Sequence, residues 1–333
     1  MFGRPFDIIA IGDITTDAFI KLKEAEVHCK INTQDCELCM RFGDKLPFES
    51  VKVVRAVGNA PNAAVAAARL GLHSALVTNI GDDQNGRECI QTLRKEHVDT
   101  IYVKVHKGQP TNYHFVLWYD VDRTILVNHV PYEYILPKVK PPKWVYLTSL
   151  GANTFPYHMA IADYLETNPS VKLAFQPGTF QMQLGFEELK RIYDKTEVFF
   201  VNVEEAQRIL GYDTSVRDIK KLFKGIASHG PKLIIITDNT NGAYMFDGDH
   251  YYHIPMYPDP RPAFERTGCG DAFAATFISA LAMGKTPLEA FLWAPINPMS
   301  VAQFVGAQEG LLTFDQLEWW LKNAPPEYKP KEI

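Results

Sequence analysis

A short glycine-containing segment near residue 270 combines two features that suit phosphoryl transfer. The segment reads TGCGD from Thr267 to Asp271 and is followed by an apolar, helix-like pattern over 272–283. The first turn of a helix leaves backbone N–H groups unpaired, and the helix dipole adds partial positive charge there, so such a turn can bind an anion. Asp271 lies at this turn, where its carboxylate is placed to accept a hydroxyl proton.

A purely structural explanation of the same segment stays open at this point. A Gly-x-Gly-Asp turn before an apolar helix also occurs where the Asp only caps the helix N-terminus. Short glycine motifs match many unrelated sequences, so the segment alone does not separate a catalytic Asp271 from a capping one.

The composition of the whole chain is that of a globular protein and argues against several classes of function. Its 333 residues are 46% hydrophobic and 22% charged, which allows one large domain or two ordinary ones. With 34 basic and 39 acidic side chains the formal net charge is -5, so no electrostatic basis for binding nucleic acid is present. No apolar run reaches the ~18 residues that a membrane helix needs, and the first residues lack a signal-peptide layout. The 5 cysteines are irregularly spaced, which favours a reducing compartment, so we expect a cytoplasmic protein without a membrane partner.

Short apolar runs alternate with helical patterns along most of the chain. This alternation predicts right-handed βαβ units and one mainly parallel sheet. In such a sheet the loops after the strands meet at one edge, where open α/β sheets bind ligands. The expected strands cover 7–11, 75–80, 144–147, 172–175, 198–201 and 233–236.

Two polar residues in the first part of the chain are candidates for ligand binding. Asp17 ends a predicted loop, 12–17, at the carboxyl end of the first strand, and the neighbouring Asp13 is interpreted as a loop residue. Asn62 precedes an alanine-rich helical run that stops at Gly71, and it is a natural N-cap. Capping and turn formation would explain both Asp17 and Asn62 without any ligand.

The segments 24–56 and 111–130 have a looser, strand-like alternation. Two alternating runs within 111–130 predict a hairpin. The first segment carries Cys29, Cys36 and Cys39, and a Cys-x-x-Cys pair is compatible with a metal. The adjacent His28 and Cys29 can hardly both ligate one tetrahedral ion, however, and no second Cys-x-x-Cys completes a four-ligand set. We therefore expect strands without a metal.

Taken together, these motifs resemble those of the ribokinase-like sugar kinases, the PfkB family. Its signature usually reads Asp-Thr-x-Gly-Ala-Gly-Asp, which Thr267, both glycines and Asp271 match. Glu265, Arg266 and Cys269 depart from it. The resemblance runs from Asp7 to about Leu321 and includes Gly-Asp-Asp-x-x-Gly at 81–86 and Asn-x-x-Glu at 202–205. It implies a single domain over 1–333 with a three-layer α/β fold, a mainly parallel central sheet, and a small β lid formed by 24–56 and 111–130.

The resemblance also implies an ATP-dependent kinase that phosphorylates a hydroxyl of a sugar or sugar-like substrate. Asp271 would take the proton, while the amides of Gly268, Cys269 and Gly270 hold the developing negative charge. The substrate-binding residues it implies are Asp17, Asn62, Gly58 and Asn59. The nucleotide-binding residues are Thr237, Gly242, Thr267 and Asn297. Mg2+ would be held, largely through water, by Asn202 and Glu205.

Several alternatives stay open within this resemblance. The acceptor could be a nucleoside or a sugar phosphate, and the departures from the signature are compatible with a non-catalytic ligand-binding protein. Asp17 and Asn62 suit a vicinal diol and no Lys/Arg cluster marks a phosphate pocket, so we expect an unphosphorylated acceptor. Glu265 replaces an Asp near which family members often hold a potassium-type ion, which puts a monovalent cation in doubt. A homodimer through the lid is the remaining partner hypothesis.

Overall fold

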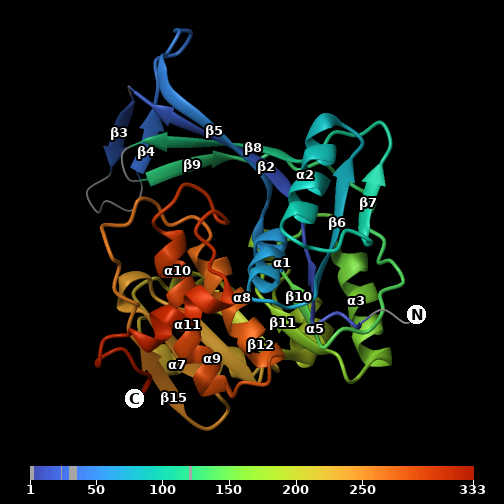
Figure 1. Ribbon diagram of the computed structural model, residues 1–333, viewed down its shortest axis with the longest axis vertical. Coiled ribbons are helices and arrows are strands. Elements are labelled where there is room, and N and C mark those ends of the chain that lie inside the picture. The colour runs from blue at the N-terminus through green and yellow to red at the C-terminus, as the bar shows by residue number, and fades with distance from the viewer. Residues whose placement is uncertain (1–3, 24, 30–35, 120–121) are drawn as a thin grey trace.

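A ten-stranded sheet forms the centre of the protein (Figure 1). The structure is a computed structural model that describes residues 4–23, 25–29, 36–119 and 122–333. From one edge to the other, the strands are β16 (Lys331–Glu332), β15 (Tyr251–Ile254), β14 (Ala243–Phe246), β13 (Leu233–Thr237), β12 (Thr196–Asn202), β11 (Lys172–Phe175), β10 (Trp144–Leu147), β1 (Ile8–Ile11), β6 (Ser74–Gly81) and β7 (Val103–His106).

Seven neighbouring strands of this sheet are parallel, namely β13, β12, β11, β10, β1, β6 and β7. The other three, β14, β15 and β16, are joined to the sheet by antiparallel pairing. Successive side chains of a strand point to opposite faces of the sheet, and both faces are buried in apolar clusters. Ile8 and Ala10 of β1 pack in one apolar cluster, and Ile9 and Ile11 pack in the other. The predicted three-layer arrangement with a mainly parallel sheet is confirmed.

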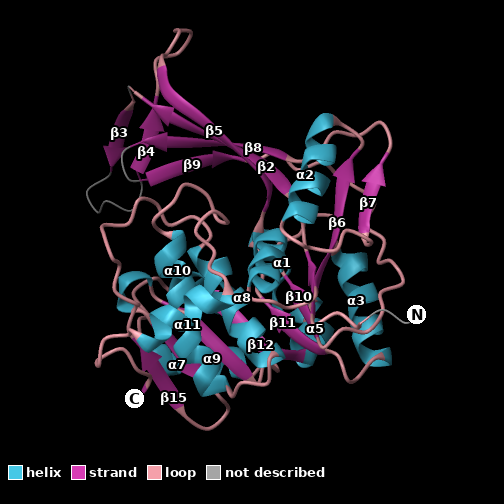
Figure 2. Cartoon of the chain, viewed as in Figure 1, coloured by secondary structure: helices cyan, strands magenta, loops and turns pink. Residues whose placement is uncertain are grey.

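Helices cover both faces of this sheet (Figure 2). The face that includes Ile8 is covered by α1 (Asn59–Arg69), α2 (Gln84–Lys95), α8 (Cys269–Ala282), α9 (Pro287–Trp293), α10 (Ile296–Val301) and α11 (Phe314–Lys322). The opposite face is covered by α3 (Phe155–Thr167), α4 (Thr179–Glu188), α5 (Lys190–Lys195), α6 (Val203–Leu210) and α7 (Ile219–Ala227).

A second, smaller layer of strands lies at one end of this body (Figure 1), and we call it the lid sheet. Its four strands are, in spatial order, β5 (Phe48–Val57), β2 (Thr15–Leu22), β8 (Tyr113–Tyr119) and β9 (Asp122–Leu126). The predicted hairpin is confirmed as the antiparallel pair β8–β9. The prediction of a loop over 12–17 is wrong in its second half, since β2 begins at Thr15 and forms an inner strand of the lid sheet, paired to both β5 and β8.

The cysteine-bearing segment contributes a separate two-stranded sheet, β3 (Glu26–Cys29) with β4 (Cys36–Cys39). Cys29 is opposite Cys36 in the backbone register, and the side chains of both lie outside the described residues. The described residues contain no group of three or more His, Cys, Asp or Glu that could hold a metal ion. The absence of a metal from the cysteine segment therefore stays a prediction.

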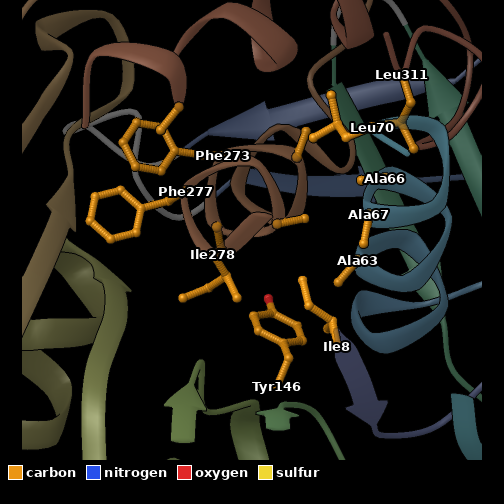
Figure 3. Packing of buried hydrophobic residues seen from close by; sticks show 14 of the residues in the cluster. Ile8, Ala63, Ala66, Ala67, Leu70, Tyr146, Phe273, Phe277, Ile278 and Leu311 are labelled. Atoms are coloured by element: carbon orange, nitrogen blue, oxygen red, sulfur yellow. The ribbon is translucent and has the colours of Figure 1, made fainter. Parts of the chain in front are cut away.

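Helices α1 and α8 lie side by side above the centre of the sheet (Figure 3). Ala63, Ala66 and Ala67 give α1 a surface of small side chains toward this contact, which allows a close approach to α8. Below them, the Tyr146 ring rises from the sheet between Ile8 and Ile278. This packing fixes the two helix N-termini relative to each other.

The predicted N-cap of α1 is one turn too late. The helix begins at Asn59 with Gly58 as N-cap residue, so Asn62 is the fourth residue of the helix and is 5% exposed. Asn62 does not cap the helix because its side chain contacts another part of the chain, as described below. In the described ranges, no helix is long and apolar enough to cross a membrane.

Candidate active site

The loops after the parallel strands meet at one edge of the sheet, beside the point where the chain order reverses between β1 and β10. β1 leads to Asp13, β11 to Gln176, β12 to Asn202 and β13 to Asp238. The N-terminus of α8 lies at the same edge, because Asp271 contacts Gln176 there. Residues far apart in sequence therefore converge as the strand pattern predicts.

Two cavities open at this edge. The first, of about 510 Å³, lies under the lid sheet and we call it the lid cavity. It is lined by Thr15, Asp17, Phe19, Val57, Gly58, Asn59, Asn62, His114, Ile125, Val127, His129, Ser149, Thr179, Phe180, Thr267, Asp271 and Ala307. The second, of about 430 Å³, we call the C-terminal cavity. It is lined by Arg123, Asn202, Thr237, Asn239, Gly242, Met256, Arg266, Cys269, Gly270, Phe273, Pro295 and Pro298.

The first turn of α8 separates the two cavities. Asp271 lines the lid cavity, whereas Cys269 and Gly270 line the C-terminal cavity. A group bound in one cavity and a group bound in the other would therefore meet at the positive end of the α8 dipole. This is the arrangement that transfer of an anionic group between two ligands requires.

The Asp271 carboxylate is buried and is held by side-chain amides. Its Oδ1 accepts hydrogen bonds from Nδ2 of Asn59 (2.8 Å) and Nε2 of Gln176 (3.3 Å), and its Oδ2 accepts one from Nδ2 of Asn62 (2.8 Å). Burial raises the pKa of Asp271 to about 6, although the three amide donors act in the opposite direction. An aspartate with this pKa is ionised at neutral pH and still has appreciable affinity for a proton.

The turn before Asp271 offers fewer free amides than predicted. The Cys269 N–H donates to the carbonyl of Arg266 (3.3 Å), so this amide already has a partner. Among the described residues, no acceptor is found for the N–H groups of Gly268 and Gly270. The predicted anion hole therefore reduces to Gly268, Gly270 and the helix dipole, with Cys269 contributing only if its bond to Arg266 opens.

Gly268 cannot be replaced without moving this turn. Its φ is 80°, and a Cβ there would lie 2.2 Å from Cβ of Ala307. We expect Gly268→Ala to lower the free energy of unfolding by more than ~1 kcal/mol and to weaken nucleotide binding, since the turn must shift. Thermal unfolding and a nucleotide titration measure both effects.

Gly284 provides the matched control, since it follows the other end of α8 with a φ of 89°, and a Cβ there would have no neighbour within 4 Å. Gly284→Ala carries the same backbone strain without the collision. If Gly268→Ala and Gly284→Ala lower the free energy of unfolding and the nucleotide affinity equally, the collision with Ala307 is not the cause of the loss.

Glu265 stabilises the same loop through two hydrogen bonds. Its Oε2 accepts from the Thr267 N–H (3.0 Å), and its Oε1 accepts from the Gly306 N–H (2.8 Å). Each carboxylate oxygen of Glu265 therefore accepts a hydrogen bond from a backbone amide. Through these two bonds Glu265, which departs from the family signature, connects the turn before Asp271 to the segment that carries Ala307.

Asp17 faces the lid cavity from β2. Its Oδ1 lies 3.4 Å from Nδ1 of His114, its register partner on β8. Behind them, Nδ1 of His129 lies 3.6 Å from Oδ2 of Asp13, whose Oδ1 accepts from the Tyr134 hydroxyl (2.8 Å). Burial raises the pKa of Asp13 to about 6.

Several buried polar atoms around this cavity lack a hydrogen-bond partner in the described part of the chain: Asp17 Oδ1, His114 Nε2, His129 Nδ1 and Thr267 Oγ1. Buried polar atoms are normally paired. Asp17 Oδ1 and His129 Nδ1 already face an ionisable partner, whereas His114 Nε2 and Thr267 Oγ1 suit a hydroxyl group of a ligand. Sequence reasoning missed His114 and His129. The only sequence signal for these two histidines was the presence of a polar residue within, or directly after, an alternating strand of the lid.

Asn202 and Glu205 bind each other across the first turn of α6. Oδ1 of Asn202 accepts from the Glu205 N–H (2.7 Å), and Oε2 of Glu205 accepts from the Asn202 N–H (2.9 Å), which forms a capping box. Burial raises the pKa of Glu205, and the nearby Asp271 charge adds to this shift. A cation bound between Glu205 and Asp271 would offset the repulsion between their two carboxylates.

Comparison with known proteins identifies the group to which this chain belongs. The profile of the pfkB family carbohydrate kinases matches residues 28–308. The chain belongs to the pfkB family of carbohydrate kinases. The predicted family is confirmed, and with it the predicted enzyme class of sugar kinase.

Curated relatives of this pfkB family member span most of its length. A fructokinase of Klebsiella pneumoniae is 27% identical over 282 residues, which are 79% of this chain and 89% of that protein. An ATP-dependent 6-phosphofructokinase of Thermoanaerobacterium thermosaccharolyticum is 24% identical over 304 residues, 85% of this chain and 84% of that protein. A solved Arabidopsis thaliana ribokinase with ribose and ATP superimposes with a TM-score of 0.79 at 17% identity, covering 96% of this chain and 99% of that one. This last similarity confirms the ribokinase-like fold.

The predicted nucleotide residues of this pfkB kinase divide into three groups. Thr237 and Gly242 line the C-terminal cavity together with Asn239, which adopts a positive φ of 47°. Thr267 lines the lid cavity instead. Asn297 is 0% exposed, donates to Thr276 Oγ1 (3.0 Å) and accepts from the Leu312 N–H (2.9 Å). The amide of Asn297 therefore faces the core and not the C-terminal cavity, and its contact with the nucleotide stays a prediction that this arrangement does not favour.

Proposed function

We propose that this pfkB kinase transfers the γ-phosphoryl group of ATP to a hydroxyl of an uncharged sugar-type acceptor. The position of Asp271 carries this proposal, since the carboxylate faces the lid cavity while Gly270 of the same helical turn faces the C-terminal cavity. The acceptor binds in the lid cavity and the nucleotide in the C-terminal cavity. Relatives and structural neighbours include kinases named for ATP or solved with ATP and Mg2+.

In the transfer step, Asp271 takes the proton of the acceptor hydroxyl while the hydroxyl oxygen attacks the γ-phosphorus; the bond from that phosphorus to the β–γ bridging oxygen breaks, and ADP leaves. The Gly268 and Gly270 amides and the α8 dipole stabilise the negative charge on the transferred group. The lid sheet covers the lid cavity and keeps out water, which would compete as acceptor.

The residues at the end of β12 fit a Mg2+ ion, because Asn202 and Glu205 present oxygen atoms, the ligands that Mg2+ prefers. When bound, the ion neutralises charge on the nucleotide phosphates. Asn202 and Glu205 are already paired with each other, so they would hold the ion through water.

The lining of the lid cavity favours an uncharged acceptor. None of its described side chains is lysine or arginine, whereas Asp17 and Asp271 are both acidic. A phosphate or carboxylate on the acceptor would meet two carboxylates and no lysine or arginine, which opposes binding. Asp17 lines this cavity, and its carboxylate suits two neighbouring hydroxyls of a sugar ring.

A nucleoside is the second candidate acceptor. Phe19, Ile125, Val127 and Phe180 give the lid cavity an apolar wall, which a free monosaccharide would use less fully than a nucleoside base. Both candidates have an uncharged acceptor with a vicinal diol.

The test is a panel of acceptors assayed for ADP formation with ATP and Mg2+. We expect turnover with at least one free pentose, hexose or nucleoside, and at least tenfold lower kcat/KM for the corresponding sugar phosphate. Robust turnover of fructose 6-phosphate with none of the free sugars or nucleosides would contradict the uncharged acceptor. Ligand binding without turnover of any acceptor would instead support the non-catalytic alternative.

A further inference from the structure

The donors around Asp271 are all of one chemical kind. Asn59, Asn62 and Gln176 each present a primary amide to the carboxylate, at 2.8, 2.8 and 3.3 Å. No cationic side chain in the described part of the chain is within hydrogen-bond distance of Asp271. A buried carboxylate is more often paired with Arg or Lys, which would hold its pKa low and make it a weak base.

Two of these amides are oriented by a further hydrogen bond to their oxygen atom. Oε1 of Gln176 accepts from the hydroxyl of Tyr146, which is fully buried on β10. Oδ1 of Asn62 accepts from Nε2 of Gln308 (2.9 Å), which also donates to the Ala56 carbonyl (2.8 Å). Because a side-chain amide has one oxygen end and one N–H end, occupation of the oxygen directs the N–H groups to Asp271.

Gln176 differs from the other two amides in its relation to the ligand sites. Asn59 and Asn62 line the lid cavity and are therefore in reach of an acceptor. Gln176 is absent from the described lining of both cavities, yet it contacts Asp271 and is fixed from below by Tyr146. Among the described residues, its side-chain hydrogen bonds are therefore with the carboxylate of Asp271 and the hydroxyl of Tyr146, and not with the residues of a ligand site other than Asp271.

We propose that Gln176, held by Tyr146, is a positioning residue that sets the proton affinity of the catalytic base Asp271. This inference rests on the proposed function, in which Asp271 is the base. A neutral donor offsets part of the cost of burying the charged form and leaves the carboxylate basic enough to take a hydroxyl proton. Gln176 also holds one oxygen of Asp271, so that the remaining lone pairs face the lid cavity.

Other titratable groups around Asp271 act on the same proton. Glu205 on α6 and the Tyr146 hydroxyl on β10 interact with it electrostatically. Asp17, His114 and His129 share the lid cavity with it. Of these groups only the Tyr146 hydroxyl contacts Gln176, so substitutions at Gln176 leave the others as a constant background, and Tyr146→Phe measures the effect of the hydroxyl.

The test is the acid limb of the kcat–pH profile in three variants, Gln176→Met, Gln176→Glu and Tyr146→Phe. The wild-type limb is expected near pH 6, where kcat falls as Asp271 becomes protonated. Gln176→Met removes a donor to the ionised form, so the limb should move up by ~0.5–1 pH unit. Gln176→Glu adds a second carboxylate and should move it up by ~1 unit or more. Tyr146→Phe frees the Gln176 amide to turn, which should give a smaller shift in the same direction.

Gln181→Met is the matched control. Gln181 is a fully buried glutamine near this sheet edge, and its Nε2 donates to the Thr148 carbonyl (2.9 Å) and not to Asp271. Its loss should reduce stability without moving the acid limb. Unshifted limbs in both Gln176 variants, or an equal shift in Gln181→Met, would overturn the proposal.

A second readout does not depend on turnover. The titration of Asp271 can be followed by ¹³C NMR of protein labelled at the Asp carboxyl carbon, with the signal assigned by its loss in Asp271→Asn. An upward shift of this titration in Gln176→Met supports the positioning role even if no acceptor is turned over, in which case only the proposed function fails. An unshifted titration beside normal wild-type turnover overturns the positioning role alone.

Discussion

Asp271→Asn is expected to lower kcat by ~10²–10⁴ while the affinity for ATP stays within a few-fold of wild type. Asn has the same shape but cannot take a proton from the acceptor hydroxyl. The free amides of the turn belong to the backbone of Gly268 and Gly270, which the substitution leaves in place. A steady-state assay beside a nucleotide titration measures both quantities. Retention of more than about a tenth of the wild-type kcat would show that Asp271 is not the base.

Thermal unfolding of the same variant serves as its control. Because burial raises the pKa of Asp271 to about 6, the ionised carboxylate lowers the free energy of unfolding at neutral pH, and Asn removes that cost. Against this, an amide at position 271 faces the Nδ2 donor of Asn62, which now lacks its acceptor. We expect these effects to offset each other and Tm to stay within ~5 °C. A lost kcat with a preserved Tm separates catalysis from folding.

Asp17→Ala is expected to reduce kcat/KM for the acceptor by ~10²–10⁴ without changing the affinity for ATP. A hydrogen bond from a hydroxyl to a carboxylate contributes ~1.5–3 kcal/mol, and Asp17 is positioned to accept two of them. The loss should appear mainly as a higher KM for the acceptor, since Asp17 lines the lid cavity and does not contact Asp271.

Asp44→Ala is the control for this variant, because Asp44 is an exposed carboxylate outside the lid cavity. Both variants remove one negative charge, so a change common to both is a general charge effect. An acceptor KM in Asp17→Ala within threefold of the control would remove Asp17 from the binding site.

Much of the fold could be predicted because its signals are local. The buried strands β10, β11 and β13 are short apolar runs, and each was predicted within a residue of its observed bounds. The position of Asp271 at a helix N-terminus follows from the glycines before it and the apolar pattern after it. Their convergence at one edge also follows, because parallel strands joined by right-handed crossovers bring their carboxyl ends together.

The partners of the candidate site residues were decided by the tertiary structure alone. Asn62 satisfies every local rule for an N-cap, but it lies inside α1 and donates to Asp271, 209 positions away in sequence. Asn297 is turned into the core by the packing of α10 against α8, although its position in sequence suggested a nucleotide contact. Neither outcome is encoded within a few residues of the side chain concerned.

The lid sheet shows why the local sequence predicts individual elements but not the contacts between them. The backbone of Thr15–Leu22 forms a strand because β5 and β8 supply hydrogen-bond partners on its two sides, and only that pairing brings Asp17 beside His114. Local sequence determines helix starts, buried runs and turns through short-range sterics and solvation. Which strands pair, and which side chains meet across them, depends on contacts between distant segments, and these exist only in the folded chain.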